Sequence, residues 1–335
     1  MITRIMATVA NDRCRTDFVR SLCEAGMTGV RINSAHVSPD GFRQMVATLR
    51  SVDPSLNILM DTKGPEVRTT ALPSPLELQP GSRIRLASGT GESSENCIYV
   101  AVERLVDYVS FGSEILIDDG EVVLKVLSVT DGIIEAEAVN AAILGSRKTV
   151  AITGAELPPL PAVSERDREN IAAAVECGID MIAHSFVRSR ADVEAVRALI
   201  DGSPIRLFSK IECREAVENL DEIIEASDGI LVARGDLGTH IPLPDIPTVQ
   251  LRAVLAARRI GKPTILATQM LQSMISRPSP TRAELSDIAL AVMEGFDWLL
   301  LTGETAVGQY PAECVAMANL TAESAENNRM RCIIN

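Results

Sequence analysis

The sequence predicts an α/β protein: a (β/α)8 TIM barrel with a small all-β lid domain inserted after the third strand. Eight short apolar segments recur along the chain, and all but one are closely followed by a helical pattern. Continuous Val, Ile and Leu runs are typical of strands that are buried on both faces of a parallel sheet. Eight β–α units favour a closed barrel over an open sheet.

The first part of the barrel is expected at residues 1–69, with strands at 3–9, 29–33 and 57–62. The helix between the first two strands should end at Gly26, because glycine readily takes the left-handed conformation that closes helices. Ser38 is expected as an N-cap, and Pro39 suits the first turn of a helix that runs to about residue 50.

The second part of the barrel is expected at residues 158–335. Its strands are expected at 181–186, 205–211, 229–236, 263–269 and 298–304. Its helices are expected at about 164–176, 190–200, 213–226, 247–260 and 281–294, and after Pro311. Ser164 should cap the first of these helices, and Thr281 with Glu284 has the spacing of a capping box. The glycines expected to end helices are Gly178, Gly261 and Gly295.

The inserted β domain is expected at residues 70–157. Apolar and polar residues alternate at 82–88 and 97–102, and two Asp-Gly pairs, at 119–120 and 131–132, stand between alternating segments as hairpin turns. Prolines at 73 and 75, and at 158, 159 and 161, indicate stiff linkers at the two edges. We expect this domain to close over the carboxyl ends of the barrel strands as a lid.

Composition excludes several classes of protein. The 32 Lys and Arg residues against 45 Asp and Glu residues give a charge of −13, which disfavours a nucleic-acid partner. We expect no membrane span and no signal peptide, because no apolar run is long enough and the N-terminus lacks the required pattern. Seven scattered cysteines indicate reduced thiols, and three histidines argue against a histidine-rich metal site. The scattered cysteines favour a cytoplasmic location.

Polar residues follow almost every predicted strand, at the end of the barrel where such folds carry their chemistry. We expect the cations Arg31 and Lys210 to converge there with the carboxylates Glu212 and Asp236. Carboxylates with open positions suit Mg²⁺ or Mn²⁺, and a cation beside such a metal can neutralise a phosphoryl group in transfer. The polar residues at strand ends are Arg31, Asn33, Asp61, Thr62, Lys63, Ser185, Lys210, Glu212, Arg234, Asp236, Thr268, Gln269, Thr302 and Glu304.

Each of these residues also has a plainer interpretation. A Lys-x-Glu pair at a strand end is more often a surface ion pair, and Asp236 is also suited to cap a short helix. His184, within an apolar strand, is expected to be a satisfied core histidine, and His240 to be structural. Cys213 is expected to serve packing. The convergence of so many strand ends favours a site over these separate interpretations.

At these residues the chain resembles the pyruvate kinase family. The strings that carry the resemblance are GMTGVRIN (26–33), MDTKGPEVRT (60–69), PAVSERD (161–167), SFVR (185–188), SKIE (209–212), SDGILVARGDLG (227–238), GKPTILATQMLQSM (261–274), PSPTRAELSDIA (278–289) and TGETAVGQYP (302–311). The resemblance implies a barrel A domain, a mobile B domain, and phosphoryl transfer from phosphoenolpyruvate to ADP. Members usually continue into a C-terminal effector-binding domain, which we expect to be absent here, and a homo-oligomer would form through the barrel.

The resemblance also implies a role for each matching residue. Lys210 would stabilise the transferring phosphoryl group, and Arg31 would hold the phosphate. Glu212 and Asp236 would bind Mg²⁺ or Mn²⁺. The substrate-binding residues would be Arg31, Ser185, Lys210, Gly235, Asp236 and Thr268, with Thr268 near the proton delivered to C3. Asn33, Asp61 and Thr62 match the K⁺ site, and Glu66 matches the K⁺-using version of the family. Arg68, Lys148 and His36 match nucleotide-binding positions.

The departures from the family pattern fall on the nucleotide and cation side. Asn11 replaces the proline expected against the adenine, and Ala35 removes a hydroxyl ligand of the K⁺ site, which Ser34 would replace in part. In the lid, the family's Lys-Gly-Val-Asn-x-Pro-Gly is replaced by residues 148–154, KTVAITG. Three hypotheses therefore stay open. These are a minimal pyruvate kinase, an enzyme of this fold with another acceptor or reaction, and a non-catalytic paralogue.

Overall fold

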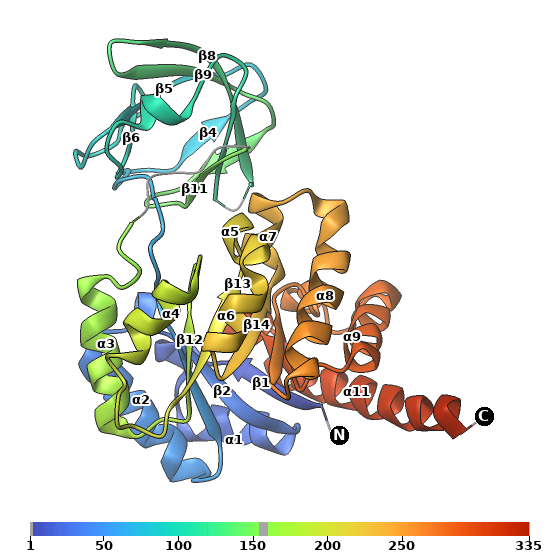
Figure 1. Ribbon diagram of the computed structural model, residues 1–335. Helices are drawn as coiled ribbons and strands as arrows, with labels where there is room; N and C mark the ends of the chain where they lie inside the picture. Colours follow the sequence, from blue (N-terminus) through green and yellow to red (C-terminus); the bar gives the residue numbers. More distant parts are fainter. Residues whose placement is uncertain (1–2, 119, 154–159, 335) are drawn as a thin grey trace. The chain divides into compact units, whose positions relative to one another are not determined.

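The computed structural model describes residues 3–118, 120–153 and 160–334, with side chains described up to Asn328. The chain divides into two compact units (Figure 1). The first comprises Met1–Gly64, Ala162–Leu237 and Pro244–Asn335, and the second comprises Pro65–Pro161 with Gly238–Leu243. Each unit has its own apolar core.

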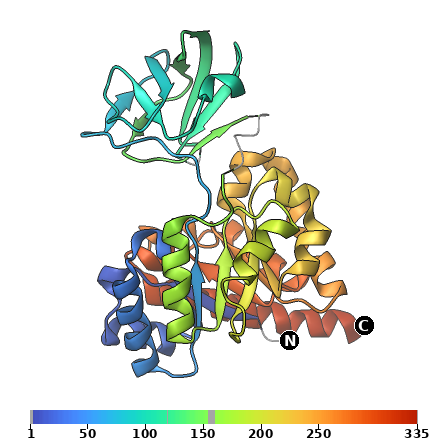
Figure 2. The same cartoon turned by 60° about the vertical axis from the view of Figure 1, so that its left-hand side comes forward.

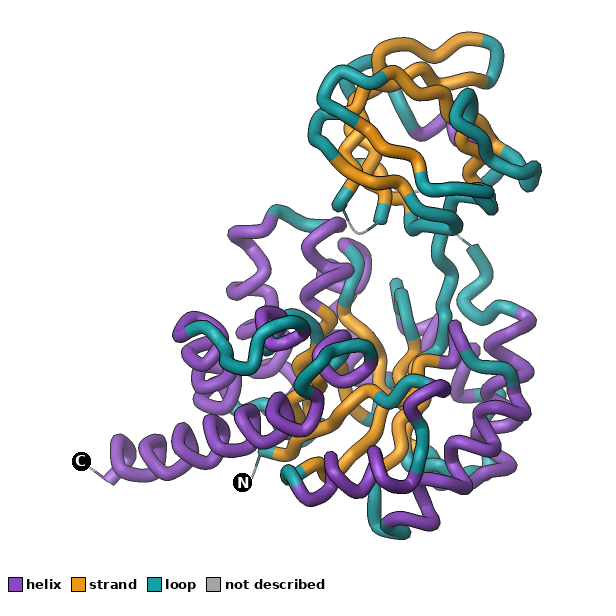
Figure 3. The backbone as a smooth tube through the Cα atoms, turned by 180° about the vertical axis from the view of Figure 1, so that it is seen from behind, coloured by secondary structure: helices purple, strands orange, loops and turns teal. Residues whose placement is uncertain are grey.

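The first unit is a closed barrel in which neighbouring strands are parallel, as the sequence predicts. Around the barrel the order is β1-β16-β15-β14-β13-β12-β3-β2, so strands that are neighbours in this unit's sequence are neighbours in space. Figure 3 shows these strands enclosed by helices. The strands are β1 Arg4–Thr8, β2 Met27–Asn33, β3 Asn57–Asp61, β12 Met181–His184, β13 Arg206–Ile211, β14 Gly229–Ala233, β15 Thr264–Ala267 and β16 Trp298–Leu301.

Helices alternate with the barrel strands along the chain. They are α1 Thr16–Glu24, α2 Pro39–Val52, α3 Glu165–Cys177, α4 Arg190–Arg197, α5 Arg214–Glu218, α6 Leu220–Ala226, α7 Arg234–His240, α8 Ile246–Arg259, α9 Arg282–Glu294, α10 Gly303–Ala306 and α11 Pro311–Ile334. The expected caps are confirmed: Ser38 accepts from Gly41, Ser164 accepts from Asp167, and Thr281 forms the capping box. The N-terminal end of the barrel lies beside α11 (Figure 2), where the Thr3 N–H donates to Glu326.

Alternate residues of each strand fill the barrel interior. The interior cluster contains Met6, Leu59, Met181, Ala183, Phe208, Leu231, Ala233, Ile265, Ala267, Trp298 and Leu300. Close packing there excludes side chains at Gly229, because a Cβ would lie 2.3 Å from the Phe208 ring. Since side chains alternate along a strand, residues two positions after Leu59, Ala183 and Phe208 also face inward, at the carboxyl end. Those residues are Asp61, Ser185 and Lys210.

The second unit is an all-β domain, as predicted. Its main sheet has the order β11-β7-β8-β9-β5-β6, and β10 pairs with β4 in a separate sheet. The strands are β4 Leu76–Leu78, β5 Arg83–Ser88, β6 Ile98–Val100, β7 Glu114–Ile117, β8 Val122–Thr130, β9 Ile133–Ala138, β10 Ala142–Leu144 and β11 Val150–Ile152. The turn between β8 and β9 has positive φ at both Asp131 (51°) and Gly132 (80°), which is the hairpin geometry expected of an Asp-Gly pair.

Several predicted boundaries are wrong. The expected strand at 229–236 ends at Ala233, where α7 begins, and the expected strand at 298–304 ends at Leu301, before α10. The expected single helix at 213–226 is two helices, α5 and α6, which meet at Asn219. The expected strand at 181–186 ends at His184. The predicted domain boundary at residues 157 and 158, and one residue of the first Asp-Gly pair, lie outside the described residues.

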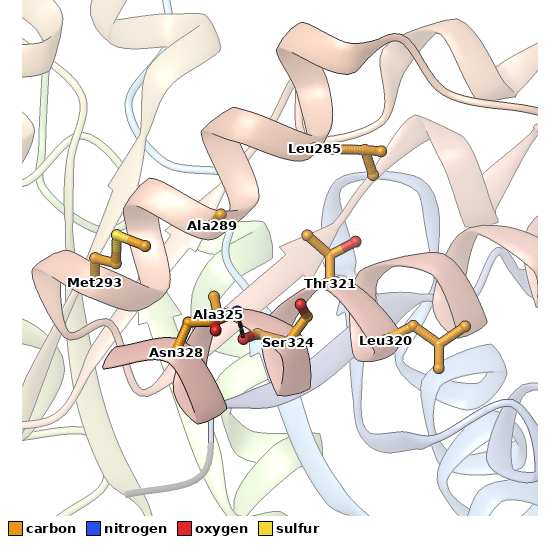
Figure 4. Close-up of a pocket in the computed structure, with 8 residues that line it drawn as sticks. All are labelled: Leu285, Ala289, Met293, Leu320, Thr321, Ser324, Ala325 and Asn328. Atoms are coloured by element: carbon orange, nitrogen blue, oxygen red, sulfur yellow. Dashed lines mark hydrogen bonds between the residues drawn. The ribbon is translucent and has the colours of Figure 1, made fainter. Parts of the chain in front are cut away.

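No helix among the described residues combines the length and the apolar character needed to cross a bilayer. A shallow pocket lies between α9 and α11 on the outer surface of the barrel (Figure 4). Its lining residues are Leu285, Ala289, Met293, Leu320, Thr321, Ser324, Ala325 and Asn328, none of which is a predicted site residue.

Candidate active site at the carboxyl ends of the barrel strands

The carboxylate of Asp61 joins the two cations that the sequence places at strand ends. Asp61 is 2% exposed, and its Oδ2 accepts a hydrogen bond of 2.8 Å from Arg31 Nε and lies 2.6 Å from Arg31 Nη2. Its Oδ1 lies 3.3 Å from Lys210 Nζ and accepts from Ser185 Oγ at 3.0 Å. Burial raises the pKa of Asp61, but the charges of Lys210 and Arg31 outweigh burial and hold that pKa below its ordinary value. An ionised Asp61 therefore keeps both cations in one cluster.

Lys210 is buried among oxygen atoms. Its Nζ lies 2.9 Å from Ser185 Oγ and 3.0 Å from Glu212 Oε2, in addition to its contact with Asp61. Burial lowers the pKa of Lys210, but the charges of Asp61, Glu212 and Asp236 raise it above the ordinary value. The ammonium group is therefore protonated over the whole physiological range, as a group that stabilises a developing negative charge must be.

Glu212 is fully buried next to Lys210. Its Oε1 accepts a 2.7 Å hydrogen bond from the N–H of Phe186, whose backbone is left-handed with a φ of 53°. Burial raises the pKa of Glu212 to about 8, and the charges of Asp236 and Asp61 add to this effect while Lys210 opposes it. The predicted Lys-x-Glu pair is thus a buried contact, and its interpretation as a surface pair is wrong.

The residues present fit a divalent cation. Glu212 Oε2 is buried and lies 3.0 Å from the Lys210 ammonium group, and the nearby Asp236 supplies a second carboxylate. Among the residues that the structure describes, no group of three or more His, Cys, Asp and Glu side chains is placed to hold a metal. Mg²⁺ is commonly bound by one or two carboxylates, with water and substrate phosphates supplying the other ligands. Glu212 and Asp236 meet that requirement.

Thr268 and Gly235 lie together beside this cluster. The Gly235 N–H donates a 2.8 Å hydrogen bond to Thr268 Oγ1. Gly235 and Asp236 belong to the first turn of α7, which begins at Arg234, so Asp236 lies inside the short helix that the plainer interpretation had it cap. Its charge nevertheless acts on both Lys210 and Glu212, which places the α7 N-terminus at the predicted site.

The residues that match a K⁺ site come from neighbouring strands, because Asn33 and Asp61 are register partners. Asn33 Oδ1 accepts from the Ala35 N–H at 3.1 Å. The hydroxyl of Ser34 is buried and donates to the Asp61 carbonyl at 2.8 Å. Thr62 O accepts from Ser185 Oγ at 2.7 Å. Asp61 already balances two cations, so a monovalent cation here would share that carboxylate with Arg31 and Lys210.

The residues that match nucleotide-binding positions are divided between the units. His36 is exposed on the first unit, at the end of a short 3-10 helix, Ser34–His36. Arg68 and Lys148 belong to the second unit, where Lys148 O accepts from the Thr69 N–H. Each of these two cations is paired with a carboxylate of its own unit: Arg68 with Glu66 at 2.7 Å and Lys148 with Asp118 at 2.7 Å.

Other strand-end residues stabilise the protein's own backbone. The buried carboxylate of Glu304 accepts from the N–H groups of Leu271 (3.0 Å) and Thr302 (2.8 Å). His184 is buried, as expected, but the prediction that it is satisfied is wrong, because neither ring nitrogen has a partner among the described residues. Burial lowers the pKa of His184 to about 4, so the ring is neutral.

The sequence analysis missed Asp167, a buried residue that shapes the loop after β3. Its carboxylate accepts from the N–H groups of Lys63 (2.8 Å) and Gly64 (3.2 Å) and from Ser164 Oγ (2.7 Å). Gly64 has a φ of 73°, and a Cβ there would lie 2.7 Å from Ser185 Cβ. Two signals in the sequence pointed to Asp167: its position three residues after the predicted N-cap Ser164, and its place at the end of the family string PAVSERD (161–167).

Comparisons with known proteins agree with this arrangement. The family model described as the pyruvate kinase barrel domain matches residues 1–315. The pyruvate kinase of Borreliella burgdorferi is 38% identical over 331 residues, covering 98% of this chain and 69% of its own length. The pyruvate kinase of Sporosarcina psychrophila is 39% identical, and the match covers 98% of this chain and 58% of that enzyme. The pyruvate kinase of Geobacillus stearothermophilus is 40% identical, and the match covers 93% of this chain and 55% of that enzyme.

This chain therefore spans between 55% and 69% of the length of these three relatives. The matched region includes every residue of the buried cluster, all of the second unit, and the first unit up to residue 315. The chain belongs to the pyruvate kinase family.

Proposed function

We propose that this chain transfers the phosphoryl group of phosphoenolpyruvate to ADP, giving pyruvate and ATP. The observation that carries the proposal is the buried cluster of Arg31, Lys210 and Asp61, in which one ionised carboxylate holds two cations at the carboxyl end of the barrel. Two fixed cations beside two further carboxylates suit a phosphorylated acid bound with a divalent metal. The names of the relatives support the same reaction.

The chain's own residues would divide the work of binding and charge stabilisation. Arg31 would bind the phosphate through its guanidinium group, and Lys210 would stabilise the negative charge of the phosphoryl group in transfer. Because both are held by ion pairs, little reorganisation is needed during the reaction. Glu212 and Asp236 would hold Mg²⁺ or Mn²⁺, which when bound neutralises phosphate charge as a Lewis acid.

The carboxylate and enolate part of phosphoenolpyruvate would be bound around α7. The Gly235 and Asp236 backbone lies at a helix N-terminus, which favours a carboxylate. Thr268, fixed by the Gly235 N–H, would lie near the proton that is delivered to C3 of the enolate. Ser185 would support substrate binding through Lys210, since its hydroxyl contacts the ammonium group.

The nucleotide, K⁺ and domain assignments are further parts of this proposal. Arg68, Lys148 and His36 would bind ADP, and Asn33, Asp61 and Thr62 would bind K⁺ without the hydroxyl that Ala35 lacks. Residues 1–69 and 158–335 would form the A domain, and residues 70–157 would form a lid that excludes water during transfer. The six cysteines with described side chains are free thiols, which supports a cytoplasmic location. A homo-oligomer would form through the barrel.

A second candidate is an enzyme that uses another acceptor in place of ADP. The observation that favours it is the pairing of Arg68 and Lys148 with carboxylates, together with the sequence departures at Asn11 and Ala35. All of these features concern the residues proposed to bind ADP and K⁺, whereas the residues of the buried cluster are those that the family pattern expects.

A coupled assay of pyruvate formation tests the proposal. Purified protein receives phosphoenolpyruvate and Mg²⁺, with or without ADP and with or without K⁺. ADP-dependent formation of pyruvate is the expected result. Metal-dependent binding of phosphoenolpyruvate without turnover on ADP would contradict the proposed reaction and favour the second candidate. No binding of either substrate would contradict both.

A further inference from the structure

Thr268 and Gln269, directly after β15, have backbone conformations that are unusual for their residue types. Their φ angles are 71° and 56°, in the left-handed region. A β-branched residue such as threonine is a genuine outlier there, because its side chain clashes with the backbone. Such a conformation persists only where surrounding contacts impose it.

The guanidinium group of Arg234 supplies those contacts. Its Nη2 donates to the carbonyl of Thr268 at 2.9 Å and to that of Gln269 at 3.3 Å. Its Nη1 donates to Asp287 Oδ1 on α9 at 2.7 Å, and the side chain is 11% exposed. The planar group can hold two carbonyls and one carboxylate at once because its donors are fixed in a fork.

The residue after Arg234 fixes the side chain of Thr268 as well. Because the Gly235 N–H donates to Thr268 Oγ1, the hydroxyl oxygen is an acceptor in this contact, and its own hydrogen points elsewhere. Arg234 and Gly235 are consecutive in the first turn of α7. One turn of helix therefore sets both the backbone and the hydroxyl direction of Thr268.

We propose that Arg234 is a positioning residue that holds the Thr268 hydroxyl in place for the protonation of the enolate. The inference rests on the proposed function, because it concerns the step in which C3 of the enolate gains a proton and the enolate oxygen becomes the carbonyl of pyruvate. Without the guanidinium group, residues 268 and 269 are free to relax to ordinary backbone angles. The hydroxyl then moves away, while Arg31 and Lys210 still bind the phosphate.

Three variants test this role. Arg234→Met keeps a long apolar side chain but removes the guanidinium donors, and Arg234→Lys keeps the positive charge. The matched control is Arg197→Met: Arg197 also bridges a carbonyl (Ala226, 2.8 Å) and a carboxylate (Asp228, 3.1 Å), before the amino end of β14. We expect Arg234→Met to lower kcat about 100-fold, as expected for a misplaced reacting group, with KM for phosphoenolpyruvate near the wild-type value. Arg234→Lys should recover part of kcat, and Arg197→Met should keep all of it.

A second readout isolates the protonation step. Incubating pyruvate with the enzyme in D₂O exchanges C3 hydrogens for deuterium, and NMR should show this exchange slowed in Arg234→Met as strongly as kcat. Wild-type kcat and exchange in Arg234→Met would overturn the inference, as would an equal loss in Arg197→Met. If Arg234→Met does not fold, Asp287→Asn weakens the same anchor, and an unchanged kcat in that variant would overturn the inference.

A crystal structure of Arg234→Met separates this inference from the proposed function. An inactive wild-type protein would contradict the proposed function, and the structure would then decide the role of Arg234 by itself. We expect residue 268 to leave the left-handed region in the variant. A φ near 71° at Thr268 without the guanidinium group would overturn the inference.

Discussion

Replacing Glu212 by Gln should make the metal-free protein more stable above about pH 5, although it removes a residue of the proposed metal site. Burial beside Asp236 and Asp61 raises the pKa of Glu212 from 4.5 to about 8. Glutamine keeps an oxygen that can accept from the Phe186 N–H, and Lys210 keeps its contact with Asp61. The variant therefore loses a buried titratable group and keeps the packing.

The sign of the pH dependence follows from the proton count. Between pH 4.5 and 8, the folded protein holds a proton on Glu212 that the unfolded chain has released, so a rising pH favours unfolding. At about 1.4 kcal/mol for each pKa unit, the free energy of unfolding falls by about 3 kcal/mol at pH 7 and by about 5 kcal/mol well above pH 8. This contribution is absent from the variant, which has no titrating group at that position.

Urea unfolding followed by the fluorescence of Trp298, the single tryptophan and a buried barrel residue, measures the difference. The series runs from pH 5 to pH 8 in the presence of a chelator, with the wild type and Glu212→Gln side by side. We expect the stability gap between the two proteins to widen with pH in favour of the variant, and Mg²⁺ to stabilise only the wild type. Parallel pH profiles, or a less stable variant at pH 8, would refute the reasoning.

Three further predictions concern stability and are checked by thermal unfolding. Gly64→Ala should cost more than about 1 kcal/mol, because φ is 73° and the new Cβ would meet Ser185, so an unchanged Tm would contradict the geometry. His184→Leu should be neutral or should stabilise by about 1 kcal/mol, because it removes a buried ring that has no partner in the described part of the chain; a large loss of stability would reveal a partner. Thr281→Ala should cost about 1 kcal/mol through the lost capping box, and a Tm equal to that of the wild type would argue against it.

Much of the fold could be predicted because burial leaves a strong pattern in the sequence. The barrel strands are continuous apolar runs, since both of their faces are covered, and the polar residue after each run marks its carboxyl end. That rule located Arg31, Lys210 and Glu212. The three-residue strands β4, β10 and β11 were missed, because three residues are too few to show alternation.

The central position of Asp61 could not be predicted, because it depends on three-dimensional register. It requires β2, β3, β12 and β13 to be aligned so that Arg31, Ser185 and Lys210 reach one carboxylate. The start of α7 at Arg234 was hidden because the helix begins at the residue directly after β14, with no linker between them.

The left-handed conformation of Thr268 left no trace in the sequence either, since neither threonine nor glutamine favours it. It depends on contacts from Arg234, on another strand–helix unit. Features that depend on contacts between separate strands thus cannot be predicted from the order of apolar and polar residues along the chain.

The proposed function depends on the ammonium group of Lys210, and following the reaction by phosphorus NMR tests it most directly. Phosphoenolpyruvate, ADP and Mg²⁺ are incubated with the wild type and with Lys210→Met, which keeps a side chain of similar length without the charge. We predict that the wild type forms ATP and pyruvate in equal amounts, and that the variant turns over about 100- to 1,000-fold more slowly. Equal rates for the two proteins, or no ATP from the wild type, would contradict the proposed mechanism.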